Sequence, residues 1–507
     1  MRVRSVLACG LLFGCSASEE SVEPVSTPAE SDGPRVVLLV SMEAARADSL
    51  ECYADSDHWA YYVTTEMQRL GVPAARIASQ QQRFPHASTE TICGLAETGV
   101  RFRWALSHAP STLSSHVSMM SGMDPHRHRV SGDGHPVSDE IPLLAERMQS
   151  SGWDTIGVVA TDALASSMGL NRGFRRYVDP VSLPVDGAPV ISALEVNRRV
   201  LAEIDSRASE EDLFLFVEYA DAQFPWFDAA APEYFAPELF RDEFVEARYT
   251  GNLNGDIESI DRARRTRAQG QLTITDSIRA RGLYLSQVSW IDQQFGQLLE
   301  GLEERGLMQD VLVVVTADHG MTLDELTAMS YSHGFQTDLR SLHVPLVVHG
   351  RGSLGMENTG ITFDPVIRLM DLPSTILAAA GIAEAHGDGQ DFGALWRGER
   401  YAARPHLAEA TSGQLARQGS WSNLLFPQAL IRDGFVLQRW YGVTDGQIRE
   451  QHMLHRLAVG QPPIPLNGPD GAAAQVTLQS LAATLARWNE GVPAASNSTG
   501  NQETPTP

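Results

Sequence analysis

Short runs of β-branched and other apolar residues recur along the chain, and a polar segment follows each of them. Uninterrupted runs of this kind are typical of strands buried on both faces of a parallel sheet. Between them lie segments with apolar residues at helical intervals, notably residues 141–152 and 284–305. Strands that alternate with helices predict an α/β domain with a mainly parallel sheet. The runs expected to form strands are residues 35–40, 155–160, 213–219, 311–316 and 344–348.

The pattern of elements changes along the chain and predicts domain boundaries. The alternating strands and helices extend over residues 34–400, with a charged, weakly periodic insertion at about residues 228–271. Over residues 401–490, short strand candidates precede a helix at residues 473–488, which predicts a small C-terminal α+β subdomain. Residues 491–507 are polar and lack core-forming side chains, so we expect a disordered tail.

Composition excludes several classes of protein. A chain of 507 residues with 43% hydrophobic and 20% charged residues is globular. Its 39 basic and 63 acidic side chains give a net charge of −24, which repels phosphate backbones, so we expect no nucleic-acid partner. All of its basic side chains are arginines, which excludes any mechanism that uses a catalytic lysine.

The first residues resemble a bacterial export signal. Two arginines precede an apolar run, residues 6–14, that is too short to span a bilayer. The run ends in Leu-Phe-Gly-Cys, which resembles a lipobox, in which cleavage leaves Cys15 to carry lipid. An ordinary cleaved signal peptide is the alternative. We expect a lipoprotein signal peptide over residues 1–15 and a flexible tether over residues 16–33. The protein would then lie in the bacterial cell envelope, on the periplasmic or surface side, and touch the membrane only through this lipid anchor.

Export would also permit a disulfide between Cys52 and Cys93. Two cysteines at this separation do not establish a bond, and two buried free thiols are an equally open interpretation.

Polar side chains follow three of the predicted strands. Glu43 and Arg46 follow the first strand, Gln223 lies in the segment after residues 213–219, and Asp318 and His319 follow residues 311–316. Ligands collect outside the carboxyl ends of strands in open α/β sheets. Carboxylates at two strand ends beside an imidazole are therefore candidate ligands of a divalent cation, although helix capping would explain either carboxylate taken singly.

Several longer segments resemble the sulfatase family of the alkaline-phosphatase-like superfamily. The similar segments run in the family's order over nearly all of residues 35–488. This resemblance implies a three-layer α/β/α fold with a small C-terminal subdomain. The segments are the nucleophile block at residues 109–128, the metal motif at residues 318–320, the pair 333–334 with residues 342–346, and the structural stretches 144–147, 152–153 and 370–375.

The resemblance also implies a metal centre. It places Glu43, Asp318 and His319 at metal-ligand positions and Thr112 at the nucleophile, which also touches the metal. These mostly hard oxygen ligands suit one divalent cation, Ca²⁺ first, with Mg²⁺ and Mn²⁺ as alternatives. A cation at this position lowers the pKa of the hydroxyl and stabilises charge on the ester oxygens.

Further roles follow from the same resemblance. His116, His333 and Arg46 would supply hydrogen bonds to the ester oxygens or protonate the leaving group. A structural role remains open for each of the three, above all for Arg46 as a loop brace. Gln223 stands where the family has a substrate-contacting histidine, and an amide can donate a hydrogen bond but cannot act as an acid at neutral pH.

The chain departs from the family pattern at its nucleophile. Sulfatases oxidise a cysteine or serine to formylglycine within a Cys/Ser-x-Pro-x-Arg motif, whereas residues 112–116 read Thr-Leu-Ser-Ser-His. At the first metal position, Glu43 replaces the usual aspartate. We therefore expect a metal-dependent hydrolase of anionic esters, either sulfate esters or phosphate monoesters and diesters, that uses unmodified Thr112. Its substrate would be a small-molecule, glycan or lipid-headgroup ester. An ordinary sulfatase and a catalytically impaired binding protein of this fold are the alternatives.

Overall fold

The computed structural model describes most of the chain between residues 33 and 490. The predicted signal peptide with Cys15, almost all of the tether and the predicted tail lie outside the described residues. The described segments are residues 33–56, 86–130, 134–180, 191–229, 235–244, 249–268, 272–323, 330–356, 359–383, 386–410, 427–444, 447–458 and 471–490, with the single residues 73, 75, 132, 232, 464 and 466.

A nine-stranded sheet forms the centre of the fold, with the order β4-β3-β5-β1-β6-β8-β2-β7 and with β9 paired to β2. β1 (Val36–Met42) lies between β5 (Leu213–Tyr219) and β6 (Val311–Ala317) and is parallel to both. Every residue of these three strands is buried, which explains their nearly uninterrupted apolar sequences. The other strands are β2 (Val100–Leu106), β3 (Asp154–Val158), β4 (Arg176–Val178), β7 (His343–Val344), β8 (Leu346–Gly350) and β9 (Ile361–Arg368).

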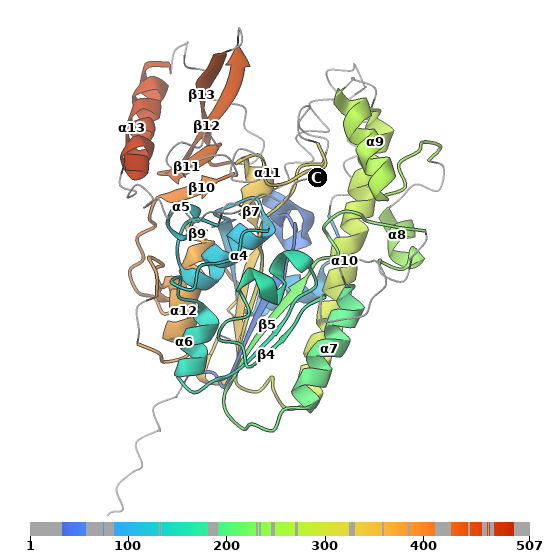
Figure 1. The fold of residues 1–507 in the computed structure, drawn as a ribbon, viewed down its shortest axis with the longest axis vertical. Helices are drawn as coiled ribbons and strands as arrows, with labels where there is room; N and C mark the ends of the chain where they lie inside the picture. Colours follow the sequence, from blue (N-terminus) through green and yellow to red (C-terminus); the bar gives the residue numbers. More distant parts are fainter. Residues whose placement is uncertain are drawn as a thin grey trace, which may run out of the picture. The chain divides into compact units, whose positions relative to one another are not determined.

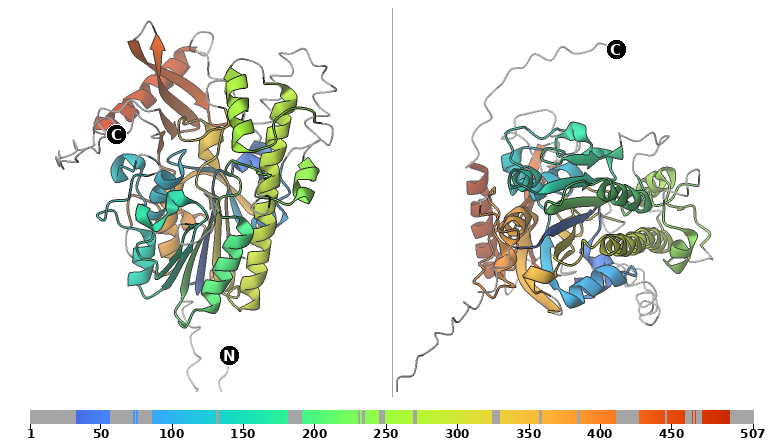
Figure 2. Two further views of the ribbon diagram at one scale, coloured as in Figure 1. Left: turned by 45° about the vertical axis from the view of Figure 1, so that its right-hand side comes forward. Right: turned by 90° about the horizontal axis from the view of Figure 1, so that it is seen from below.

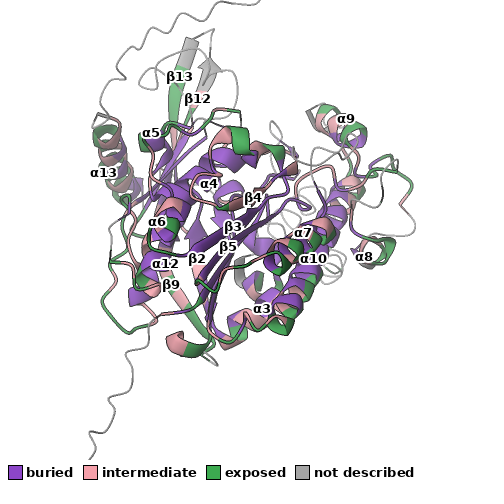
Figure 3. Cartoon of the chain, turned by 60° about the horizontal axis from the view of Figure 1, so that its bottom comes forward, coloured by how far each residue is buried: buried purple, intermediate pink, exposed green. Residues whose placement is uncertain are grey.

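Helices cover both faces of this sheet (Figure 1). The view from below shows the sheet between two layers of helices, and the strands at its centre are buried (Figures 2 and 3). The predicted three-layer α/β/α architecture is therefore confirmed. One face carries α4 (Thr112–Ser121), α6 (Leu144–Ser150) and α12 (Leu372–Ala379), and the other carries α3 (Glu90–Thr98), α7 (Ala193–Asp205) and α10 (Ile274–Glu304).

All of the predicted strands are present, but one of them is divided into two strands. Residues 344–348 were expected to form one strand, but Pro345 has no N–H for a sheet ladder and separates β7 from β8. The predicted helix at residues 284–305 begins earlier, at Ile274. Two helices, α8 (Glu238–Phe244) and α9 (Ile257–Ala268), lie in the predicted insertion.

The C-terminal part adds an antiparallel sheet with the order β10-β11-β12-β13 and a long helix, α13 (Gly471–Glu490). Leucines of the sheet pack against Leu481 and Leu485 of this helix. A separate cluster joins Ala408 and Ile431 of the small sheet to Leu106 of β2. The predicted α+β character is thus confirmed, whereas the boundary at residue 401 stays a prediction. The strands are β10 (His406–Glu409), β11 (Gln428–Arg432), β12 (Phe435–Thr444) and β13 (Gln447–Arg456).

A disulfide joins Cys52 to Cys93, whose Cα atoms lie 5.5 Å apart. It connects the 3₁₀ helix Glu51–Ser56, which follows β1, to α3. The structure therefore favours the bond over two free thiols. None of the helices in the described part of the chain combines the length and the apolar content that a membrane span requires.

Candidate active site

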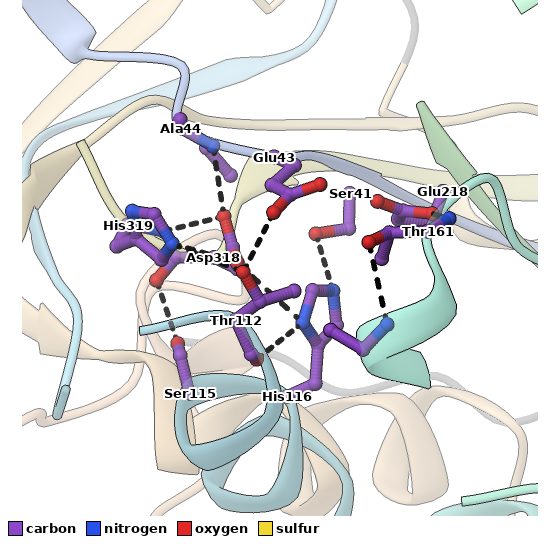
Figure 4. A network of polar contacts seen from close by, with 12 residues as sticks. Ser41, Glu43, Ala44, Thr112, Ser115, His116, Thr161, Glu218, Asp318 and His319 are labelled. Atoms are coloured by element: carbon purple, nitrogen blue, oxygen red, sulfur yellow. Dashed lines mark hydrogen bonds and ion pairs between the residues drawn. The ribbon is translucent and has the colours of Figure 1, made fainter. Parts of the chain in front are cut away.

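The candidate site lies where β1 and β6 end and α4 begins (Figure 4). These strands are parallel neighbours, with Met42 opposite Ala317, so their ends bring Glu43 and Asp318 to the same edge of the sheet. Thr112 is the first residue of α4. The unmatched N–H groups and the dipole of a helix N-terminus favour negative charge at this position.

Thr112 is engaged by two of the predicted ligands. Its hydroxyl donates a hydrogen bond to Oε1 of Glu43 at 2.7 Å, and its Oγ1 lies 3.3 Å from Nε2 of His319. Thr112 is 1% exposed and Glu43 is 3% exposed, so bulk water does not compete for this bond. The arrangement places two proton-accepting groups beside one hydroxyl.

Asp318 and His319 are fixed by main-chain contacts. Oδ1 of Asp318 accepts hydrogen bonds from the N–H groups of Ala44 at 3.1 Å and His319 at 2.7 Å. Ala44 adopts φ +60°, which is uncommon for a residue with a Cβ atom and aims its N–H at this carboxylate. Nδ1 of His319 donates to the carbonyl oxygen of Gly320 at 2.7 Å. In the neutral ring, Nε2 therefore presents a lone pair, 3.4 Å from Oδ2 of Asp318.

His116 lies in the same network, and both of its ring nitrogens are used. Nδ1 donates to the carbonyl oxygen of Thr112 at 2.7 Å, and Nε2 lies 2.9 Å from the hydroxyl of Ser41. Burial lowers the pKa of His116 to about 3, so the ring is neutral and Nε2 accepts from Ser41. These contacts favour the structural alternative, in which His116 joins α4 to β1. Its role toward the ester stays a prediction.

Gln223 and His333 meet beside His319. The amide nitrogen of Gln223 donates to Nε2 of His333 at 2.6 Å, and the two imidazole rings of His319 and His333 stack at 4.7 Å. The N–H of Phe224 donates to Oε1 of Gln223 at 3.2 Å, which supports this orientation of the amide. Both side chains are half-buried. They bring polar groups to a more accessible side of the site.

Arg46 is engaged in a different set of contacts. Its guanidinium forms a bidentate ion pair with Asp48, at 2.7 and 2.6 Å, and both side chains are 1% exposed. It also donates to the carbonyl oxygen of Met321 at 3.3 Å. This geometry favours the alternative in which Arg46 braces the loop after β1. Asp48 was not predicted as part of the site, although an arginine and an aspartate that flank one residue shortly after a strand are a readable signal for such a brace.

Three other buried polar residues of this network were also missed. The hydroxyl of Ser115 donates to the main-chain carbonyl of Asp318 at 2.6 Å, and Ser41 contacts His116. Glu218 of β5 accepts hydrogen bonds from the N–H groups of residues 160 and 161, and burial, with the nearby charge of Asp318, raises its pKa to about 8. The sequence could have indicated Glu218, because it is a carboxylate inside an otherwise apolar strand.

The side chains around Thr112 can be tested for their fit to a cation. Across the described segments, no group of three or more His, Cys, Asp or Glu side chains is arranged as a metal site. The donor types nevertheless suit a hard divalent cation, since the Glu43 carboxylate and the His319 imidazole contact the Thr112 hydroxyl, and the Asp318 carboxylate lies beside His319. Oδ2 of Asp318 lies 3.4 Å from Nε2 of His319, and when this ring is neutral both atoms are acceptors, an arrangement that a positive charge would stabilise.

Similar proteins were found both by sequence and by structure. Arylsulfatase K of Bos taurus is 30% identical over 115 residues, which cover 22% of this chain and 20% of that protein. Choline-sulfatase of Rhizobium meliloti (strain 1021) is 21% identical over 330 residues, 57% of this chain and 62% of that protein. The chain thus spans about a fifth of the first relative and less than two thirds of the second.

The fold has close counterparts among solved structures. The phosphonate monoester hydrolase of Agrobacterium radiobacter superposes with a TM-score of 0.62 at 16% identity, covering 90% of this chain and 96% of that one. At this identity the likeness concerns the fold alone. A family model described as sulfatase matches residues 35–382, well over half of the chain. This match shows that the chain belongs to the sulfatase family.

Proposed function

We propose that this protein hydrolyses anionic esters and that unmodified Thr112 is its nucleophile. The contact that carries the proposal is the 2.7 Å hydrogen bond from the Thr112 hydroxyl to Glu43, with Nε2 of His319 at 3.3 Å. A hydroxyl that faces two proton acceptors at a helix N-terminus can lose its proton as it attacks. Membership of the sulfatase family supports the class of reaction.

The reaction would proceed in two displacements. Oγ1 of Thr112 forms a bond to the phosphorus or sulfur of the ester while its proton passes to Glu43 or His319. The bond to the alcohol oxygen breaks, and this oxygen takes up a proton as it leaves. His333 is the half-buried imidazole beside the site that would supply this proton in its protonated form, and the Gln223 amide would then turn its oxygen toward Nε2. Water then attacks the threonyl ester and releases the acid and the free hydroxyl.

Glu43, Asp318, His319 and Thr112 are proposed to hold one divalent cation, Ca²⁺ before Mg²⁺ or Mn²⁺. When bound, the ion would stabilise charge on the ester oxygens. Elemental analysis of the purified protein after equilibration with each cation tests this assignment. We expect one ion per chain, and we expect its loss in Asp318→Ala but not in Asp388→Ala, a change of a solvent-exposed carboxylate paired with Arg127. A wild-type protein without stoichiometric metal would contradict the assignment.

Phosphate-type esters are proposed as better substrates than sulfate esters. Formylglycine enzymes eject sulfate through a hemiacetal, and threonine offers no such route, whereas water can clear a phosphothreonine. Initial rates with an aryl sulfate, an aryl phosphate and a phosphodiester test this order. Faster turnover of the sulfate ester would overturn it.

A second candidate function is binding without turnover by the same fold. It is favoured by two departures from the family pattern, Glu43 in place of the usual aspartate and Gln223 in place of a substrate-contacting histidine. Its signature would be saturable binding of sulfate or phosphate with no hydrolysis of any of the three esters. Turnover that depends on Thr112 would exclude it.

The protein is also proposed to be exported and anchored through lipid on Cys15. The disulfide between Cys52 and Cys93 supports this location, because such bonds persist in oxidising compartments. Membrane fractionation of Cys15→Ser tests it, with Cys9→Ser as a matched control in the same segment. We expect only the first change to release the protein from membranes. Unchanged fractionation of Cys15→Ser would contradict the anchor.

A further inference from the structure

Two buried histidines join the C-terminal sheet to the segment that leads into α4. Nδ1 of His108 donates to the carbonyl oxygen of Leu407 at 2.7 Å, and Nε2 of His406 donates to the carbonyl oxygen of Ser107 at 2.9 Å. The ring centroids lie 4.4 Å apart. Each ring thus bonds to the main chain beside the other ring, and we call this reciprocal pair the histidine clamp.

The histidine clamp acts on the main chain that carries the nucleophile. His108 and Thr112 belong to one continuous buried segment, and the N–H of Glu409 donates to the carbonyl oxygen of His108 at 2.9 Å, so that β10 lies along it. The hydroxyl of Ser107 lies 2.9 Å from that of Ser115, which in turn donates to the main chain of Asp318. A shift of this segment would therefore move Thr112 relative to its partners.

Both rings of the clamp are neutral, which leaves each with a single N–H. His406 is fully buried and His108 is 1% exposed, and burial lowers the pKa of both, to about 3 for His406. The nearby guanidinium of Arg368 lowers both values further. Because a carbonyl oxygen can only accept, the single N–H must lie on Nδ1 of His108 and on Nε2 of His406. The two rings therefore carry opposite tautomers, a difference that substitution can exploit.

We propose that His108 and His406 are positioning residues for Thr112, through which the C-terminal sheet holds the start of α4 in place for catalysis. The catalytic part of this inference rests on the proposed function of Thr112. The mechanical part, that the histidine clamp fixes residues 107–116, does not depend on it.

Amide side chains can separate the two hydrogen bonds from simple filling of space. The glutamine amide nitrogen reaches the position of imidazole Nε2, and that of asparagine reaches Nδ1. His406→Gln and His108→Asn should therefore keep the donor, whereas His406→Asn and His108→Gln should lose it. Glutamine is the larger residue at both positions. An effect of volume alone would favour glutamine at both, whereas the clamp predicts opposite preferences at 108 and 406.

Two readouts measure these four variants in the full-length protein. In the donor-losing variants we expect kcat to fall about tenfold or more with little change in KM, since a small misplacement of a reacting group costs this much. The donor-keeping variants should stay within about threefold of wild type. Hydrogen–deuterium exchange of peptides over residues 107–116 should accelerate only in the donor-losing pair, with peptides from β3 as the internal control.

The outcomes separate this inference from the proposed function. A preference for glutamine at both positions, or unchanged exchange of residues 107–116 in His406→Asn and His108→Gln, would overturn the histidine clamp. Wild-type protein that hydrolyses none of the esters would overturn the proposed function. The hydrogen–deuterium exchange rates of residues 107–116 in the four variants would still test the histidine clamp.

Discussion

The floor of the site (Glu43, Thr112, Asp318 and His319) differs from its rim (Gln223 and His333) in how its side chains are held. Floor residues follow buried parallel strands or begin a buried helix, and none is more than 3% exposed. Two main-chain N–H groups fix Asp318, and the Gly320 carbonyl fixes His319. Rim residues lie on connecting segments and are half-buried. One hydrogen bond joins Gln223 to His333, and the His333 ring stacks on His319 of the floor.

This contrast indicates a division of labour. Groups fixed by secondary structure suit the bond-making step, which needs a geometry set before the substrate arrives. Groups on connecting segments suit the leaving group, whose size and shape vary between substrates. Substitutions in the floor should therefore lower kcat, whereas substitutions at the rim should also change which ester is preferred.

The largest effect is expected from Thr112→Ala. This change removes the proposed nucleophile, and kcat/KM should then fall at least about 10³-fold on the preferred ester. Thr112→Ser keeps the hydroxyl but loses the stiffness of a β-branched side chain, so an intermediate rate is expected. Initial rates with both variants, at matched melting temperatures, make the measurement. Robust turnover by Thr112→Ala would show that Thr112 is not the nucleophile.

Arg46→Ala tests whether Arg46 braces the loop that follows β1. It leaves the buried carboxylate of Asp48 without its bidentate partner, and breaking a buried ion pair from one side costs about 3–5 kcal/mol of unfolding free energy. Urea unfolding checks this value, and Arg35→Ala, which breaks an exposed pair with Asp212, is the control. A stable Arg46→Ala variant with a large loss of kcat would instead favour the direct role toward the ester that the family resemblance implied.

His333→Ala tests the role of a rim residue. If the proposed role of His333 as proton donor to the leaving group holds, its loss should lower kcat about 10²-fold on esters of poor leaving groups. Activated aryl esters need less protonation and should lose much less. Rates over a series of leaving groups measure this difference, and an equal loss on every ester would assign His333 a structural role.

Four buried histidines should each reduce the free energy of unfolding as the pH falls from about 6.5 toward 3, against the opposite effect of buried carboxyls such as Glu218, whose pKa is raised. Burial holds the pKa values of His116, His128 and His406 at about 3 and that of His108 well below 6.5, so these rings stay neutral while the unfolded chain binds protons. Each contributes a slope of about 1.4 kcal/mol per pH unit within this window. His406→Gln removes one of them, and urea unfolding at several pH values should show a slope reduced by this amount. An unchanged slope would contradict the neutral state of His406.

The sequence predicted well what depends on local pattern. Strands buried on both faces are apolar throughout, and their ends point to Glu43, Asp318 and His319. Contacts between distant segments were out of reach, because no local pattern indicates that His406 faces His108 or that Ser41 meets His116. The partner of Arg46 was different in this respect, because Asp48 lies only two residues further along the chain. The family resemblance brought Gln223 and His333 into the candidate site before the structure paired them.

The state of Thr112 before and during turnover tests the account most directly. Peptide mass spectrometry of the resting protein should find residue 112 as unmodified threonine. Acid quenching during turnover of a phosphate ester should then find a phosphoryl group on the same side chain. An oxidised residue 112, or a phosphoryl group on another residue while turnover continues, would contradict the assignment of Thr112 as the nucleophile.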